Sequence, residues 1–536
     1  MSQESRSRGR RVLAASAVLA AVVGGYMTVG PAVADLCDTE ALLLCEEDAG
    51  TDQALPDLIP EEQDDEPEPI KDEEPVDDGS ERPLPEESAP EDTASVPAAD
   101  EETPDPDLKT EYFVYGPTSR ADVGRVTAAG ATITGGDLGY LTVMATATQA
   151  EQLADLGFGV RSRAVPDEVE PGHATYESLM AQVNNLVRTY PNLVRKQLIG
   201  KSHEKRNLIA VKITGDVAKS DVAKSDVAKS DVAKSRPKPE VLFVHHQHAR
   251  EVVTLDMARY LLDLFTRNYC KGGRCTDEQK TITRLLDTRV VWIVPDLNPD
   301  GGVWDRSGML DGKPVYRESR KNRQPNTGAR STLNPSDDPV GTDLNRNWGY
   351  QWNTTGSDIR KESETYRGPA AFSAPETRAA RDFVARRNKD RQRITMAVDW
   401  HSFLSAVLSP YGYTKNERDG QMTLDQRQVF DRLGQQLADR YSAGKVSYRR
   451  ASSLVPEGSP PPAGGMIDWL WGNQKIFAFA LEMGAGKSGV VKEHNPFYPP
   501  ASMIEDITAE NKAAVLHLLE QADCPYRVIG KERSFC

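Results

Sequence analysis

The strongest constraint on the fold of this chain is a set of apolar segments of strand length, each followed by ionisable side chains. The segments are residues 240–245, 394–400 and 476–481. The side chains that follow them are His248 and Glu251, His401, and Glu482. Helical patterns separate the strands, and this alternation predicts an α/β fold. In open sheets of this kind ligands collect at the carboxyl ends of the strands, so these side chains should meet at one edge.

The spacing of these residues suits a metal site. His248 and Glu251 are three apart, which on a helical turn places an imidazole nitrogen and a carboxylate oxygen on one side. With His401, two histidines and one carboxylate would leave a tetrahedral zinc ion one open position for water. Glu482 is then the candidate base beside that water. The pair His245 and His248 is an alternative set of ligands.

Two further segments offer guanidinium and amide groups. Residues 320–323 read Arg-Lys-Asn-Arg, which alone predicts a solvated run of charge. Residues 343–348 read Asp-Leu-Asn-Arg-Asn-Trp. The Asn345–Arg346 pair offers donors that match a carboxylate group.

Together these segments resemble the M14 family of zinc carboxypeptidases, the carboxypeptidase A-like metallocarboxypeptidases. The motifs follow the family's order within residues 176–521, and they are residues 248–251, 295–301, 320–323, 341–348, 401–402 and 480–482. The resemblance implies a mixed central β-sheet flanked by helices and one zinc ion per catalytic domain. It also implies hydrolysis of the last peptide bond at peptide or protein C-termini.

The resemblance assigns the metal chemistry to five residues. His248, Glu251 and His401 would be the zinc ligands, and Asp343 would accept a hydrogen bond that orients His248. Glu482 would be the general base and acid.

Five other positions would handle the substrate. Arg323 would stabilise the oxyanion, and Asn345 with Arg346 would bind the terminal carboxylate. Arg250 and Arg320 would line the approach to the site.

One part of the family pattern is absent. In the family a tyrosine that closes over the substrate lies 22 residues before the catalytic Glu, but that count from Glu482 gives Pro460. No tyrosine occurs between Tyr448 and Glu482. The same count places Ile467 at the floor of the specificity pocket, where it resembles enzymes that prefer apolar C-terminal side chains.

Residues 1–34 have the order of a secretory signal peptide. Four arginines within residues 6–11 precede an apolar run at residues 12–24, and Ala32-Val33-Ala34 supplies a small-residue cleavage site. We therefore expect a secreted, extracellular protein with no stable membrane span after cleavage. A membrane anchor is the alternative, although the apolar run is short for a bilayer.

Residues 35–107 form an acidic, Pro-rich segment. Residues 46–107 hold 26 Asp and Glu against Lys71 and Arg82, a local charge of −24. Because the whole chain carries −16, the remainder carries +8. We expect a disordered spacer, since so few apolar groups cannot offset the entropy of ordering; an acidic decoy for a basic partner is the alternative. No basic run interleaved with aromatics points to nucleic acid.

Residues 108–165 predict a small ferredoxin-like α+β module in the order βαββαβ. Its expected strands are residues 111–116, 131–135, 140–145 and 159–163, and its expected helices are residues 120–129 and 149–157. A capping box formed by Thr146 and Gln149 would start the second helix. We interpret the module as an inhibitory or folding pro-segment, with Arg161 or Arg163 as exposed cleavage sites. An ordinary interaction domain is the alternative.

Residues 166–536 would form the catalytic domain of a monomeric zymogen. An exact fourfold Asp-Val-Ala-Lys-Ser repeat at residues 216–235 predicts a surface insertion loop, because long loops cost little. In an exported chain the six cysteines predict disulfides. The simplest pairs are Cys37–Cys45, Cys270–Cys275 and Cys524–Cys536.

Two other functions compete with peptide trimming. The Pro-rich replacement of the tyrosine loop leaves room for cell-wall peptides or acylated amino acids as substrates. A catalytically idle binding module is less favoured, because such a protein usually lacks a ligand or the base, and the set of roles is complete here.

Overall fold

The computed structural model describes residues 108–117, 119–137, 140–163, 167–218, 237–326, 340–389, 394–416, 422–453, 460–484 and 495–536. The expected signal peptide, acidic segment and Cys37–Cys45 pair lie outside these residues, as does most of the 216–235 repeat. Among the helices of the described part, none combines the length and apolar character of a membrane span.

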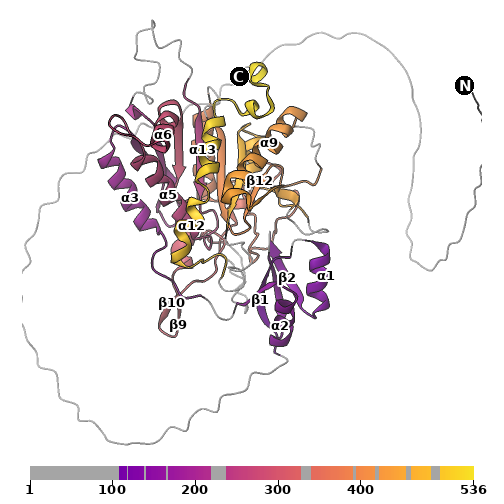
Figure 1. Ribbon diagram of the computed structural model, residues 1–536. Helices are drawn as coiled ribbons and strands as arrows, with labels where there is room; N and C mark the ends of the chain where they lie inside the picture. Colours follow the sequence, from indigo (N-terminus) through magenta and orange to yellow (C-terminus); the bar gives the residue numbers. More distant parts are fainter. Residues whose placement is uncertain are drawn as a thin grey trace, which may run out of the picture. The chain divides into compact units, whose positions relative to one another are not determined.

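The N-terminal module has the predicted βαββαβ order (Figure 1). Its elements are β1 (Thr110–Tyr115), α1 (Arg120–Ala128), β2 (Thr132–Asp137), β3 (Tyr140–Ala145), α2 (Ala147–Asp155) and β4 (Gly159–Ser162). The strands form an antiparallel sheet in the order β2-β3-β1-β4. The predicted capping box is present, because Thr146 Oγ1 accepts from the Gln149 backbone and the Gln149 side chain accepts from Thr146 N–H.

The rest of the described chain is built on an eight-stranded mixed sheet in the order β13-β12-β14-β11-β7-β8-β6-β5. Its strands are β5 (Val194–Lys201), β6 (Asn207–Ile213), β7 (Glu240–His245), β8 (Val290–Val294), β11 (Ile394–Ser402), β12 (Ala406–Ser409), β13 (Ser447–Arg450) and β14 (Phe477–Met483). A separate hairpin comprises β9 (Gly308–Leu310) and β10 (Lys313–Val315). The mixed central sheet confirms the expected fold class.

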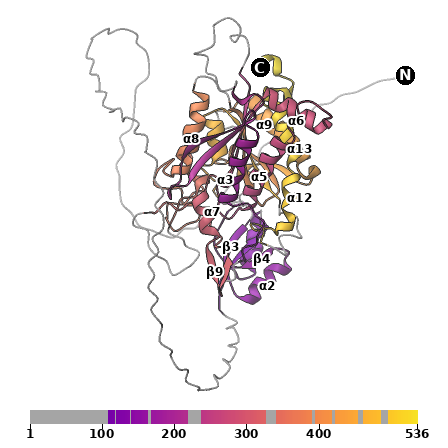
Figure 2. The same cartoon turned by 90° about the vertical axis from the view of Figure 1, so that its left-hand side faces the viewer.

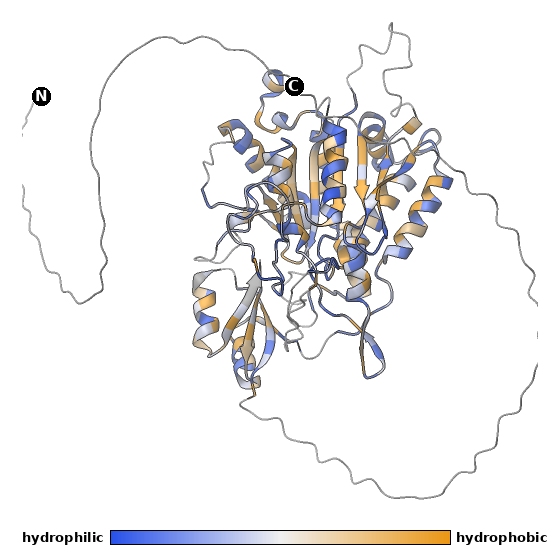
Figure 3. Ribbon diagram, turned by 180° about the vertical axis from the view of Figure 1, so that it is seen from behind, coloured by the Kyte–Doolittle hydropathy of each residue, from blue (hydrophilic) through white to orange (hydrophobic). Residues whose placement is uncertain are grey.

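Helices cover both faces of this sheet. In Figure 2, α8 lies on one side of the sheet and α5, α12 and α13 lie on the other. The helices are α3 (Tyr176–Thr189), α5 (Val253–Arg267), α6 (Asp277–Thr288), α7 (Pro299–Asp305), α8 (Pro375–Asn388), α9 (Leu424–Arg440), α10 (Met466–Gly472), α12 (Ile504–Ala509), α13 (Lys512–Gln521) and α14 (Glu532–Phe535). Figure 3 shows mostly hydrophobic strands between helices of mixed character. Strands β7 and β14 are buried throughout because both faces are covered.

Three neighbouring parallel strands position the site. Strand β11 pairs in parallel with β7 on one side and β14 on the other. Trp400 is in register with His245, and His401 is in register with Glu482. Strands β11 and β14 run two residues further than predicted, so His401 and Glu482 lie within the strands and their positions are set by sheet hydrogen bonds.

The segment between β7 and α5 differs from the sequence expectation. Residues 246–252 form a loop with a turn at residues 249–250, and α5 begins only at Val253. Glu251 N–H donates to His248 O at 3.2 Å, so a single turn brings the two side chains to one side.

Two of the predicted disulfides are confirmed. Cys270 bonds to Cys275 and Cys524 bonds to Cys536. The second bond joins Cys536 to Cys524, which lies three residues after the end of α13.

Candidate metal centre

His248, Glu251 and His401 bring three ligand atoms together at the carboxyl ends of β7 and β11. One ligand atom from each residue lies within 4.8 Å of the other two. Glu251 Oε1 lies 2.6 Å from His248 Nδ1, and Glu251 Oε2 lies 3.0 Å from His401 Nδ1. All three residues are buried, with 3% or less of their surface exposed.

The chemistry of these donors fits a zinc ion. Two imidazole nitrogens and one carboxylate oxygen are a ligand set of catalytic zinc sites, which keep one further position for water. Burial would raise the pKa of the Glu251 carboxyl, but the neighbouring His248 and His401 outweigh burial and lower it. Glu251 is therefore ionised, as a ligand to a divalent cation must be.

Asp343 lies behind His248. Its Oδ1 is 3.2 Å from His248 Nε2 and also accepts from the Asn345 backbone N–H at 2.9 Å, at the start of the short 3-10 turn Leu344–Arg346. Its Oδ2 accepts from Arg320 Nε at 2.9 Å. Burial opposes ionisation of Asp343, but Arg320 and Arg346 outweigh it and hold the pKa of this carboxyl below its usual range. Asp343 thus has the contact that the resemblance implies.

Asp399 is a further carboxylate at the site that sequence reasoning missed. Its Oδ2 lies 2.9 Å from His401 Nε2, and the residue is 1% exposed. The available signal was its spacing, since residues two apart on a strand point to the same face. Each of the two histidines therefore has its own carboxylate behind it.

The three candidate ligands line a cavity of about 40 Å³. The lining residues are Tyr140, His248, Glu251, Arg320, Asn345, Arg346, His401, Ser402, Phe403, Glu482 and Phe497. Glu482, the candidate base, thus faces the same space as the ligands, together with two arginines and an amide.

Three residues that the resemblance assigned to substrate or catalysis do not line this cavity. The guanidinium of Arg323 lies over the ring of Trp304, 4.1 Å from its centroid. Ile467 is buried at the start of α10, and Arg250 contacts two of the lining residues, Tyr140 and Phe497, without lining the cavity itself. In this arrangement Arg320, not Arg323, is the guanidinium from residues 320–323 that lies beside the ligands.

His245 does not join the metal site. Its ring lies parallel to that of Trp400, and its Nδ1 contacts the carbonyl oxygen of Val294 at 3.0 Å. Burial lowers its pKa to about 3, so the imidazole is neutral. The alternative ligand pair of His245 and His248 is therefore not formed.

One wall of the cavity comes from the N-terminal module. Tyr140, at the start of β3, lines the cavity beside the candidate ligands. It belongs to an aromatic cluster shared by the module and the catalytic domain, which comprises Phe113, Tyr115, Tyr140, Val252, Tyr316, Phe403, Phe497 and Tyr498. Val252 directly follows Glu251, and Phe403 lies two residues after His401. The apolar contact surface of the module therefore reaches the metal site.

Charged groups surround Tyr140 at the same junction. Arg250 donates to the Tyr140 hydroxyl at 2.6 Å, and this hydroxyl donates to Glu364 Oε2 at 3.1 Å. Glu364 also pairs with Arg250 at 3.1 Å and with Arg163 at 3.3 Å. Burial would raise the pKa of Glu364, but Arg250, Arg163 and Arg320 lower it to about 2.

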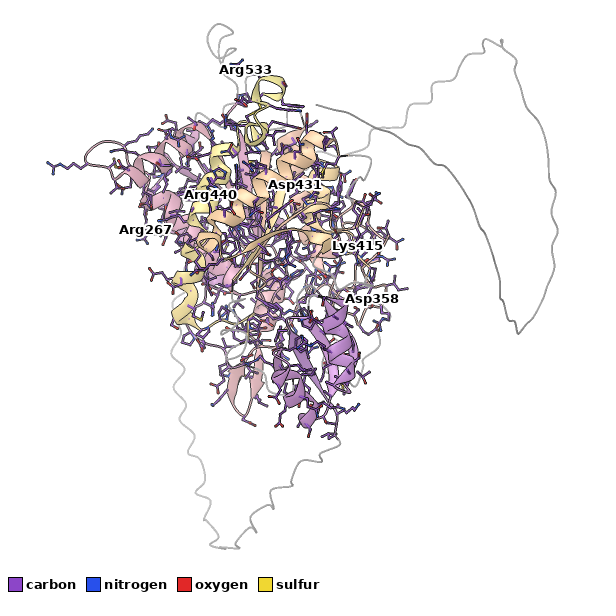
Figure 4. The ribbon with its side chains drawn as sticks, turned by 45° about the vertical axis from the view of Figure 1, so that its right-hand side comes forward. Arg267, Asp358, Lys415, Asp431, Arg440 and Arg533 are labelled. Carbon is purple, nitrogen blue, oxygen red and sulfur yellow. A yellow bond between two sulfur atoms is a disulfide. The ribbon has the colours of Figure 1, made fainter. Side chains whose placement is uncertain are left out.

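The expectation that Arg161 and Arg163 are exposed is wrong. Their side chains are 26% and 16% exposed, and they pair with Asp167 and with Glu111 and Glu364. Figure 4 labels charged side chains that do lie at the surface, among them Arg267, which is 72% exposed. The two module arginines instead belong to its contact with the catalytic domain.

Comparisons with known proteins agree with the zinc-binding chemistry of the site. Residues 179–514 match the family model described as Zinc carboxypeptidase. A zinc carboxypeptidase of Saccharothrix mutabilis subsp. capreolus is 30% identical over 448 residues, covering 79% of this chain and 91% of the relative. Metallocarboxypeptidase A of Trichophyton rubrum is 30% identical over 276 residues, covering 49% of this chain and 56% of the relative.

A solved structure shares the fold. The carboxypeptidase A from Helicoverpa armigera aligns with 79% of this chain and 99% of its own, with a TM-score of 0.54 and 20% identity. The family model spans more than half of the chain, and the three candidate ligands lie within the matched residues. The chain therefore belongs to the zinc carboxypeptidase family of metal-dependent hydrolases.

Proposed function

We propose that this protein removes C-terminal residues from peptides and proteins, using His248, Glu251 and His401 as zinc ligands and Glu482 as base. The observation that carries the proposal is the shared cavity, in which Glu482 faces the three clustered ligand atoms. A zinc ion bound there would supply a water of lowered pKa and would polarise the scissile carbonyl group.

Glu482 is positioned to move protons. It is 7% exposed, lies in β14 between β11 and β12, and its backbone carbonyl accepts from the Tyr441 hydroxyl at 3.1 Å. These contacts fix the backbone of Glu482 at the edge of the cavity that its side chain lines. Glu482 would take a proton from the attacking water and later deliver it to the leaving amine.

Asn345 and Arg346 explain the preference for a chain end. Both line the cavity, and amide and guanidinium donors together match the free carboxylate that only a terminal residue offers. Arg320 would donate to the oxygen on which negative charge develops, with its own orientation fixed by Asp343. Arg323 would share this role only after leaving the ring of Trp304.

The substrate side chain would be apolar. Ile467 supports this preference by its place in the family pattern, which puts it at the floor of the specificity pocket. The cap that a tyrosine provides in the family would be missing, because its position is held by Pro460.

The protein would be exported and made as a zymogen. Residues 1–34 support export, and the contacts of Tyr140, Arg163 and the aromatic cluster support a module that covers the site. The alignment with the Helicoverpa structure covers 79% of this chain, which is more than residues 166–536 make up, so it extends into other parts of the chain. Tyr140 of the module lines the cavity beside the candidate ligands, so removal of the module would open the site.

The test is product analysis after limited proteolysis between residues 163 and 167. The trimmed protein is incubated with a mixture of peptides that differ in their last residue, with and without a zinc chelator. Release of single C-terminal residues, lost with the chelator and recovered with zinc, is the expected result. Cleavage inside the peptides, or release of acyl groups alone, would contradict the proposal.

A further inference from the structure

His401 Nε2, the nitrogen that faces away from the candidate metal position, has two polar neighbours. Asp399 Oδ2 lies at 2.9 Å and Asn345 Nδ2 lies at 3.1 Å. A single ring nitrogen cannot satisfy both, because a carboxylate only accepts a hydrogen bond and an amide nitrogen only donates one.

The orientation of the Asn345 amide is set by a second contact. Its Oδ1 accepts from the Met466 backbone N–H at 2.9 Å, which leaves Nδ2 on the side of His401. A reversed amide would place an NH₂ group against that N–H and lose this hydrogen bond. Asn345 therefore presents a donor, not an acceptor, to the imidazole.

The tautomer of His401 determines whether its Nε2 hydrogen-bonds to Asp399 or to Asn345. Coordination through Nδ1, the nitrogen that faces Glu251, requires the proton to remain on Nε2. The Nε2–H group can donate to Asp399 but not to Asn345 Nδ2. In the metal-free protein the opposite tautomer would let Nε2 accept from Asn345.

We propose that Asp399 is a positioning residue that holds His401 in its metal-binding tautomer and thereby leaves the Asn345 amide for the substrate carboxylate. The inference rests on the proposed function, because it takes His401 as a ligand and Asn345 as part of the carboxylate site. It adds that metal binding by His401 and substrate binding by Asn345 are coupled through His401 Nε2.

The surroundings of Asp399 suit a fixed acceptor. The residue lies in β11 between Val244 of β7 and Ala480 of β14, its register partners in the two flanking strands. Gln247 donates to the same Oδ2 at 2.7 Å, and Trp348 Nε1 donates to Gln247 Oε1 at 3.0 Å. This chain of hydrogen bonds leaves the carboxylate little freedom to turn away from His401.

The decisive experiment compares Asp399→Ala with Asp399→Asn. Each variant is made as the full chain and then cleaved between residues 163 and 167. Zinc affinity is measured by competition with a chelating dye, and KM and kcat are measured with zinc in excess. Asp399→Ala should bind zinc about tenfold to a hundredfold more weakly. Its KM should rise as well, because Asn345 would turn its carbonyl oxygen toward the orphaned Nε2–H. Asp399→Asn keeps an acceptor of the same shape and should recover most of both losses.

Controls separate this effect from general damage. Glu240→Gln changes another buried carboxylate of the same sheet, at the amino end of β7, and should leave zinc affinity unchanged. Thermal unfolding of the metal-free variants shows whether they fold. If Asp399→Ala does not fold, Asp399→Asn carries the test, with a severalfold loss of zinc affinity expected because a neutral amide accepts more weakly.

Two outcomes would overturn different claims. If the unmodified protein binds no zinc, or if His401→Ala leaves zinc affinity unchanged, the proposed function fails. If the unmodified protein binds zinc through His401 while a folded Asp399→Ala matches it in zinc affinity and KM, the proposed function stands and the role of Asp399 is wrong.

Discussion

The strand ends that carry His401 and Glu482 and the module residues around Tyr140 face the same cavity, but different interactions hold them. On the catalytic side, parallel pairing of β7, β11 and β14 places the side chains by backbone register. On the module side, side-chain contacts alone hold Tyr140 against Arg250 and Glu364. Backbone register is lost only with the fold, whereas side-chain contacts can break while both parts stay folded. The strand ends therefore suit residues that must stay in place for catalysis. The module residues suit a contact that can form and break.

The largest effect is expected on the catalytic wall, from Glu482→Gln. Loss of the base should lower kcat by about a thousandfold, within the range for positioned acid–base groups. Peptide hydrolysis by the trimmed protein measures this loss. Zinc content, measured on the same samples, should be unchanged because Glu482 is not a proposed ligand. Wild-type turnover with zinc bound would remove Glu482 from the mechanism.

The next effect concerns the module wall as a whole. Cleavage between residues 163 and 167 should raise peptidase activity by about a hundredfold, if the closed arrangement is populated 99 to 1 in the uncut chain. Activity is followed against the fraction of cleaved chain on a gel. An uncut protein as active as the trimmed one would mean that the module does not cover the site in solution.

A smaller effect is expected from one hydroxyl at the junction. Tyr140→Phe removes the hydrogen bonds to Arg250 and Glu364 but leaves the ion pair between those two residues. We expect a net loss of about 1.4 kcal/mol from the closed arrangement, which is a factor of ten. Basal activity of the uncut chain should rise by about tenfold. Tyr115→Phe is the matched control, since the buried Tyr115 hydroxyl makes no hydrogen bond within the described residues. Equal effects of both substitutions would argue against a specific role for the Tyr140 hydroxyl.

The last prediction concerns a different quantity, the free energy of unfolding and its dependence on pH. Burial raises the pKa of Glu318 from 4.5 to about 7, and Arg163 opposes this only in part. The folded protein thus favours the protonated form, and its stability falls as pH rises from 4.5 through 7. Glu318→Gln avoids this cost, so it should be more stable than wild type at pH 8, by about 3 kcal/mol.

Chemical denaturation at pH 5 and pH 8 measures this difference. The stability gain of Glu318→Gln should be small at the lower pH and large at the higher one. The lowered pKa of Glu364 has the opposite sign, but it acts only below pH 4.5 and does not disturb the comparison. A gain that is equal at both pH values would show that Glu318 does not titrate in this window.

Much of the fold could be predicted because its signals are local. The six elements of the module were expected within three residues of their ends, since capping boxes, alternation and turns depend on near neighbours. The pairs Cys270–Cys275 and Cys524–Cys536 were predicted for the same reason, as each closes a short loop. The family resemblance was equally accessible, because the motifs stand in a fixed order along the chain.

The candidate site was predictable in part. His401 and Glu482 follow apolar segments, and parallel strands end at a common edge, so their meeting follows from the pattern. Asp399 escaped notice because a buried carboxylate inside an apolar strand has no motif of its own. The position of Arg323 over Trp304 could not be predicted either. A long side chain can contact several neighbours, and only the folded chain determines which of them lie within its reach.

The sequence by itself determined which residues are available for metal chemistry, the order of elements in both folded parts, and the zinc carboxypeptidase family. Only the tertiary structure decided that Tyr140 lines the cavity, that Arg163 is paired with Glu364, and that His401 Nε2 lies beside both Asp399 and Asn345. The physical reason is that periodicity and capping act over a few residues. Contacts between side chains 200 or more positions apart depend on how sheets and loops pack, as for Tyr140 and Glu364.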